Sequence, residues 1–338
     1  PIGFPMELRG PPLDFLAVTD HAAYLGVLRA IDTPGSDYAS LDYADDLFSD
    51  DRALIRDAFI RFGISIAEGE VLEEFEDSPA TRSAWAETVA SANRHYVPGE
   101  FTTFIGYEWT ASQGGTNLHR NILFRGRSVP RVPVSYLDAP TPEALWERLE
   151  ATCLETDTPC DLLSIPHNGN LGGGRMFVPV AEDGTPYTRE EAARRARLEP
   201  LVEIYQHKGA SECIAGLDDP LASEDELCDF EMFQPNLCTG APDDPDDCVG
   251  ACDDGGGVGF LGTCVGVGDF ARGTLRTGLA EWARVGANPF ELGFLGSTDT
   301  HVATSGLVRE EGWPGHAGET KDEPAEQLRV PEGALTRG

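Results

Sequence analysis

The sequence predicts an α/β barrel, and the pattern of its apolar runs carries that prediction. Short apolar runs alternate with helical patterns along the chain, starting at residues 13–18. The runs are apolar throughout, which is typical of strands buried on both faces of a parallel sheet. Most of them are followed at once by His, Asp or Glu, and a barrel gathers the C-terminal ends of its strands on one face. An open sheet would not bring so many ends together, so we expect one barrel domain over residues 1–338.

The strands are expected in chain order at 13–18, 101–107, 121–124, 161–165, 201–205 and 291–296. Helix signals lie between them. Ser78 followed by Pro79 is typical of an N-cap with proline at the first helical position, and Thr141 followed by Pro142 begins another helix. Residues 27–78 are mixed and acidic, and they give no clear assignment.

Two further helices are predicted in the second half of the chain. Thr188 and Glu191 have the spacing of a capping box, and that helix must end by Pro200. The apolar positions of the last helix lie on one face between Leu275 and Val285, and a glycine directly after it is a common helix end.

Residues 208–273 interrupt the alternation and form a long insertion between a strand and its helix. Six of the eight cysteines lie there, with an acidic run at 243–247 and a glycine run at 255–257. We expect an ordered lid stapled by disulfides, because loops this long are usually functional covers or disordered. Disulfides imply a periplasmic or secreted protein, and reduced cytosolic cysteines are the alternative.

The charge balance excludes several classes of partner. Of the 338 residues, 25 are Lys or Arg and 58 are Asp or Glu, a net charge of −33. Such a chain repels nucleic-acid phosphates and anionic membranes, so neither is expected as a partner. No apolar run reaches the ~18 residues of a membrane span. A small anionic substrate requires local cations in its pocket. The oligomeric state has no signal in the sequence.

The residues that follow the predicted strands suggest a metal centre. They are Asp20, His21, Glu108, His167, Asp299 and His301. Mixed imidazole and carboxylate donors suit zinc, manganese or iron. His119 precedes a strand rather than following one, but a short hairpin would bring it back to Glu108.

Each of these residues also has an ordinary structural interpretation. His21 could cap a helix, Glu108 could form a salt bridge at the rim, and His167 could belong to a turn. Asp299 and His301 are the sharpest pair, because their spacing puts both side chains on one side of an extended segment. Glu203 and His207 are more typical of structural rim residues than of ligands.

The motifs themselves resemble those of the PHP (polymerase and histidinol phosphatase) superfamily, with an uncharacterised branch of unknown function as the closest match. The resemblance is carried by AVTDH at 17–21, GYE at 106–108, LHRN at 118–121, PHNGN at 166–170 and GSTDTH at 296–301. Segments similar to VEIYQHKG at 202–209 and ELCDF at 226–230 also occur in that branch. The resemblance implies a distorted, TIM-like (β/α)7 barrel with two or three divalent ions and phosphoesterase-type hydrolysis.

Carried over motif by motif, the resemblance assigns the ligands. His21 would bind metal, with Asp20 as a further ligand or its partner. Glu108 would bridge metals, and His119 and His167 would bind a further ion. Asp299 and His301 would complete the set.

The chain departs from the superfamily at its start. The first strand of the superfamily ends in a His-x-His pair, and this chain has none. We therefore expect a fragment that lacks this strand and both ends of the domain, with one metal position incomplete and its own activity reduced or lost.

The sequence thus predicts a metal-dependent hydrolase, expected to use a metal-activated hydroxide on phosphate esters. Asp20, Arg175 and Lys208 are the catalytic candidates; the two cations, with Arg120 as a weaker candidate, would neutralise a small anionic substrate. Two alternatives stay open. The same ligands could serve hydrolysis of an amide or another non-phosphate bond, or the protein could be a secreted binding module with a relic metal site.

Overall fold

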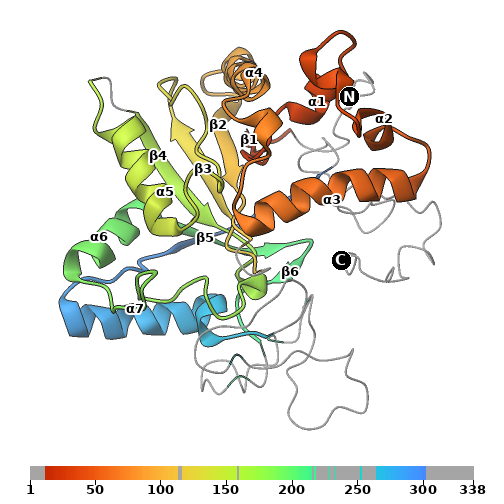
Figure 1. Ribbon diagram of the computed structural model, residues 1–338. Helices are drawn as coiled ribbons and strands as arrows, with labels where there is room; N and C mark the ends of the chain where they lie inside the picture. The colour runs from red at the N-terminus through yellow and green to blue at the C-terminus, as the bar shows by residue number, and fades with distance from the viewer. Residues whose placement is uncertain are drawn as a thin grey trace. The chain divides into compact units, whose positions relative to one another are not determined.

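The structure is a computed structural model that describes residues 12–112, 116–157, 160–214 and 264–301, together with residues 217, 228, 232 and 252 (Figure 1). The chain divides into two compact units. We call Ala17–Gly114 with His119–Leu163 the N-terminal unit, and Pro1–Leu16, Gly115–Leu118 and Ser164–Gly338 the C-terminal unit. Each unit is described by itself below.

The N-terminal unit is built on a four-stranded sheet with the order β1-β2-β3-β4. These strands are β1 (Phe15–Val18), β2 (Thr102–Trp109), β3 (Arg120–Arg125) and β4 (Asp161–Pro166), and β4 carries the chain across the unit boundary. β2 and β3 form an antiparallel pair in which Glu108 lies opposite Asn121 and Trp109 opposite Arg120. The hairpin expected to return His119 to Glu108 is therefore present.

Helices of the N-terminal unit occupy the segment that gave no clear assignment as well as the predicted positions. They are α1 (Val27–Ile31), α2 (Ala44–Leu47), α3 (Arg52–Glu68), α4 (Pro79–His95) and α5 (Pro142–Leu149). α1 to α3 surround a small core of their own, which includes Val27, Tyr43, Phe62 and Phe75. The pattern of α3 is obscured because Ile60 and Ile64 are apolar and exposed.

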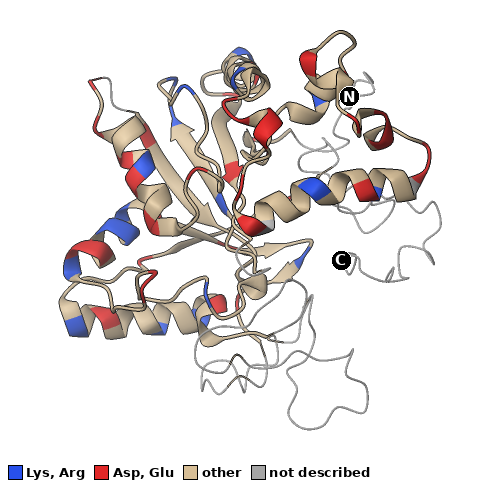
Figure 2. Cartoon of the chain, in the orientation of Figure 1, with Lys and Arg blue, Asp and Glu red and all other residues tan. Residues whose placement is uncertain are grey.

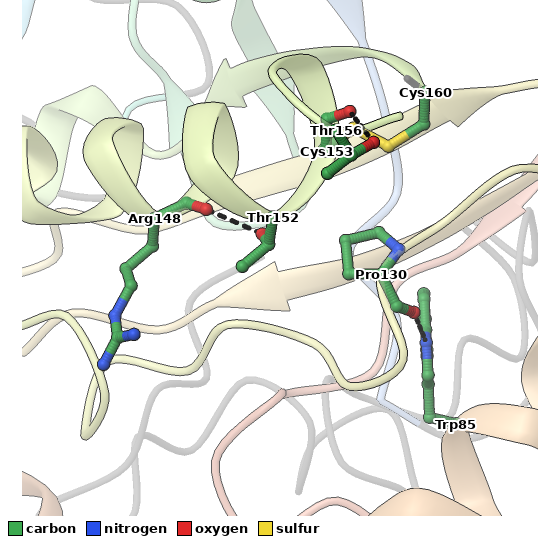
Figure 3. The surroundings of a disulfide bond; sticks show 7 residues. All are labelled: Trp85, Pro130, Arg148, Thr152, Cys153, Thr156 and Cys160. Carbon is green, nitrogen blue, oxygen red and sulfur yellow. Dashed lines mark hydrogen bonds between the residues drawn. A yellow bond between two sulfur atoms is a disulfide. The ribbon is translucent and has the colours of Figure 1, made fainter. Parts of the chain in front are cut away.

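A disulfide joins the end of α5 to the start of β4 (Figure 3). After α5 the chain makes a π-helical turn, Glu150–Leu154, and Cys153 bonds to Cys160. Both sulfur-bearing side chains are buried, and the backbone N–H of Cys160 donates to the carbonyl of Cys153 at 3.0 Å. In the same figure the indole of Trp85 donates to the carbonyl of Pro130 at 2.8 Å.

The C-terminal unit contains a second sheet, with the order β6-β5-β7. β5 (Leu201–Gln206) runs parallel to β7 (Gly293–Gly296) and antiparallel to β6 (Gly209–Ala210). Two helices accompany it, α6 (Arg189–Leu198) and α7 (Ala271–Val285). Figure 2 shows both charge signs along α6, in contrast to the acidic α2 of the N-terminal unit.

Local predictions of helix ends are confirmed. The hydroxyls of Ser78 and Thr141 accept backbone N–H bonds at the starts of α4 and α5. Thr188 and Glu191 form the reciprocal capping box of α6. Gly286 ends α7 in the left-handed conformation.

The α/β class is confirmed, whereas a barrel is not shown in the part of the chain that the structure describes. The described strands form two sheets, with no closed (β/α)7 barrel, and β2–β3 and β5–β6 are antiparallel. The physical reason is that an apolar strand pattern reports burial on both faces but not the direction or partner of the strand. Closure depends on pairings between distant strands, which the local pattern does not encode.

Disulfide formation is confirmed for the described cysteines, with the pairs Cys153–Cys160, Cys213–Cys228 and Cys252–Cys264. These bonds indicate an oxidising environment. Most of the 208–273 insertion lies outside the described residues, including Cys238, Cys248 and the acidic and glycine runs, so its role as a lid stays a prediction. Among the described residues, no helix combines the length and apolar character needed to cross a membrane.

Candidate metal centre

Backbone pairing in the N-terminal unit brings together the ends of β1 and β2. The backbone N–H of Glu108 donates to the carbonyl of Asp20 at 2.9 Å, and the N–H of Ala22 donates to the carbonyl of Glu108 at 2.9 Å. His21 and Glu108 therefore lie side by side as a parallel bridge. The β2–β3 hairpin then returns His119 to the other side of Glu108.

The Glu108 carboxylate lies between two imidazoles. His119 Nδ1 is 2.7 Å from Glu108 Oε1, and His21 Nδ1 is 3.2 Å from Glu108 Oε2. The Glu108 side chain is only 3% exposed, whereas that of His21 is 42% exposed. Burial alone would raise the pKa of the Glu108 carboxyl, but the two imidazoles outweigh burial and hold that pKa well below its usual range. The carboxylate is therefore ionised at neutral pH.

This donor set suits a divalent metal ion. The ligand atom of Glu108 lies within 4.8 Å of those of His21 and His119. Imidazole nitrogen with carboxylate oxygen is a donor combination that zinc, manganese and iron accept. Glu108 belongs to two groups that could hold a metal ion, one with His21 and one with His119, and the side chain of His21 is partly exposed.

Two hydroxyls that the sequence reasoning missed complete the surroundings of this cluster. Thr110 Oγ1 lies 2.6 Å from His21 Nδ1 and donates to Glu108 Oε1 at 3.2 Å. Ser112 Oγ lies 3.4 Å from His119 Nε2. Thr110 and Ser112 lie two and four residues after Glu108. The alternation of side chains along an extended segment was therefore the signal that could have predicted them.

A second cluster forms in the C-terminal unit at the ends of β4, β5 and β7. The amide of Gln206 donates to Asn168 Oδ1 at 2.6 Å and to Asp299 Oδ2 at 2.9 Å. The ammonium of Lys208 forms an ion pair with the same carboxylate oxygen of Asp299. His301 Nδ1 lies 3.7 Å from Asp299 Oδ1. Gln206 was not among the predicted site residues, although it directly ends β5.

The C-terminal cluster also contains a buried carboxyl with an altered pKa. Burial raises the pKa of Glu203 to about 7, against the hydrogen bonds from Ser297, Gln206 and the backbone of Asn168. Burial likewise lowers the pKa of His207 to about 4, so its ring is neutral at pH 7, and Nδ1 bonds to the carbonyl of Thr298. The structural interpretation of Glu203 and His207 fits these contacts.

The predicted ligands and catalytic residues divide between the two units. His21, Glu108 and His119 belong to the N-terminal unit, and His167, Asp299 and His301 to the C-terminal unit. His167 is buried, with 1% of its surface exposed. The catalytic candidates differ in setting, since Asp20 is exposed, Arg175 is partly buried on a glycine loop, and Lys208 is buried in its ion pair.

Comparison with known proteins places the chain in a family without assigning its activity. A family model described as "Protein of unknown function (DUF3604)" matches residues 1–335, and the chain belongs to this family. No curated protein matches the chain. No solved structure matches it either.

Proposed function

We propose that this member of the DUF3604 family is a metal-dependent hydrolase acting on phosphate esters, with its first metal ion held by Glu108, His21 and His119. One observation supports the proposal most directly: a buried, ionised carboxylate lies between two imidazole nitrogens at 2.7 and 3.2 Å. A buried carboxylate needs compensating positive charge, and a divalent ion bound through the same imidazole nitrogens would supply it.

The chemistry follows from the kind of group this cluster binds. A divalent ion bound there would lower the pKa of a coordinated water and polarise a substrate oxygen. Glu108 and the two histidines would fix its position, and Thr110 would orient His21 through the 2.6 Å contact. We also include Arg175 as a residue that binds an anionic group, because the net charge of −33 demands a local cation.

Further parts of the proposal rest on the sequence motifs rather than on the contacts. We include His167, Asp299 and His301 as ligands of a second or third ion. We also propose that the protein is related to the PHP superfamily. Lys208 is included through its ion pair with Asp299. The disulfides support a periplasmic or secreted location.

The test begins with the full chain stripped of metal and then supplied with Mn²⁺ or Zn²⁺. We expect metal-dependent hydrolysis of p-nitrophenyl phosphate or bis(p-nitrophenyl) phosphate, and loss of bound metal and of rate in Glu108→Gln. Glu87→Gln is the matched control, because Glu87 lies in the same unit in an exposed pair with Arg29. Equal metal content in the two variants would contradict the proposal.

A panel of p-nitroanilides and carboxylic esters, run beside the phosphate esters, separates the substrate classes. Metal-dependent cleavage of amides alone would replace the phosphoesterase assignment by the amide alternative. Tight metal binding without cleavage of any substrate would instead favour a binding module.

A further inference from the structure

The loop of residues 172–178 in the C-terminal unit is held through its backbone by two buried side chains, a carboxyl group and a guanidinium. We call this segment the clamped loop; it follows the end of β4 and carries Arg175. Its backbone N–H groups meet a carboxylate and its carbonyl groups meet a guanidinium. Neither of these two charged residues belongs to the candidate metal centre.

The carboxylate is that of Asp269, which is fully buried at the end of a 3-10 turn, Val267–Asp269. Asp269 Oδ2 accepts from the backbone N–H of Gly174 at 2.5 Å and from that of Gly266 at 2.9 Å. The approach is so close that a Cβ on Gly172 would lie 2.5 Å from Asp269 Oδ1. Glycine at 172 is therefore a requirement of this contact.

The guanidinium is that of Arg195 on α6, whose surface is 3% exposed. Arg195 donates to the carbonyl of Met176 at 2.8 Å and to that of Val178 at 3.1 Å. It also pairs with Glu199 at 3.2 Å and stacks on the ring of Phe290, 4.7 Å from its centroid. A planar guanidinium held on so many sides is a rigid donor.

We propose that Asp269 and Arg195 are positioning residues that hold the clamped loop so that Arg175 is preorganised to contact the anionic group of a substrate. The role of Arg175 rests on the proposed function, whereas the clamp rests on the contacts of Asp269 and Arg195 alone. Preorganised cations bind anions more tightly, because the loop loses little conformational freedom on binding. Two buried polar side chains, Asp269 and Arg195, thus hold one short backbone segment from both its N–H and its carbonyl groups.

The clamp is tested in the metal-free, substrate-free protein by hydrogen exchange of the peptide covering 172–178. Asp269→Ala and Asp269→Asn are compared with Asp183→Ala, because Asp183 also accepts a backbone N–H, from Thr185, but on the exposed surface. We expect exchange at least tenfold faster in Asp269→Ala, a smaller increase in Asp269→Asn, and no change in Asp183→Ala. Faster trypsin cleavage after Arg175 should accompany it. Unchanged exchange in both Asp269 variants would overturn the clamp.

The link to Arg175 is tested with inorganic phosphate as the probe, by calorimetry on metal-loaded protein. We expect Arg175→Ala and Asp269→Ala each to weaken phosphate binding about tenfold, and the double variant to weaken it no further. Additive losses, or unchanged affinity in either single variant, would overturn the positioning role. Arg195→Met serves the same comparison if Asp269→Ala fails to fold. A protein that binds phosphate through this loop but hydrolyses nothing refutes the proposed function and leaves the inference standing.

Discussion

The two carboxylates at the strand ends, Glu108 and Asp299, have different neighbours, and the difference separates two kinds of site. Glu108 lies between the imidazoles of His21 and His119. Asp299 is bonded to the ammonium of Lys208 and the amide of Gln206. The ammonium of Lys208 is an ion-pair partner and not a metal ligand, whereas the imidazole nitrogens beside Glu108 are themselves metal ligands. We therefore propose Glu108 as the position of the first metal ion.

The largest effect that tests this comparison is the loss of stability expected when Lys208 is replaced. The side chains of Lys208 and Asp299 are 7% and 11% exposed, so Lys208→Met leaves a buried charge without its partner. Removing one member of a buried pair costs about 3–5 kcal/mol. Urea unfolding of the metal-free protein measures the loss.

The matched control is Arg272→Met, which removes the cation of the partly exposed pair with Glu212 in the same unit. That change should cost at most about 1 kcal/mol. Adding Asp299→Asn to Lys208→Met should restore part of the stability. Equal losses for Lys208→Met and Arg272→Met would show that Asp299 does not depend on lysine for its charge balance.

A third carboxyl, Asp269, sharpens the comparison, because its partners are backbone amides. Burial raises its pKa to about 7, against the hydrogen bonds from Gly266 and Gly174. The folded state therefore holds a proton that the unfolded chain, with a carboxyl pKa of about 3.9, releases earlier. This contribution to stability is fully present below about pH 4 and is lost as the pH rises to about 7, by about 4 kcal/mol.

Asp269→Asn should remove that pH dependence, because the amide does not ionise. The measurement is the difference in unfolding free energy between the wild type and the variant at pH 4, 5, 6 and 7. Asp183→Asn controls for an exposed aspartate whose pKa is lowered rather than raised. A constant difference between the wild type and Asp269→Asn across this range would refute the assignment.

The sequence predicted what short stretches of chain decide. Ser78 and Thr188 cap their helices through bonds to residues two and three positions away, so their signals lie within a few residues. The return of His119 to Glu108 was predictable for the same reason, since one hairpin joins them. The α/β class follows from such local signals as well.

What the sequence did not predict depends on contacts between distant segments. Gln206 and Asp299 are separated by 93 positions and Gly174 and Asp269 by 95, and no periodicity relates them. The absence of a closed barrel among the described strands has the same origin, because the β5–β7 pairing joins segments far apart in the chain. Glu108 and Asp299 both fit the pattern of an acidic residue after a strand. The pattern cannot distinguish them, because their imidazole and lysine partners lie in other segments of the chain.

The smallest effect expected is the stabilisation of the protein by a metal ion at Glu108. An ion that binds only the folded state adds about 2.7 kcal/mol when its free concentration is 100 times the Kd. Glu108→Gln keeps the shape of the side chain and removes its charge, so affinity should fall at least about tenfold. The gain at the same Mn²⁺ concentration then drops to about 1.4 kcal/mol or less. Thermal or urea unfolding with and without Mn²⁺ measures it.

Two further variants decide whether this effect belongs to the Glu108 cluster. Glu87→Gln, in an exposed pair of the same unit, should keep the full gain. The double variant Lys208→Met with Asp299→Asn removes the other carboxylate without burying an unpaired charge, and it should keep most of the gain from the first ion. If this double variant loses as much as Glu108→Gln, then Asp299 binds that ion too, because only a ligand of the same ion would lower its affinity to the same extent.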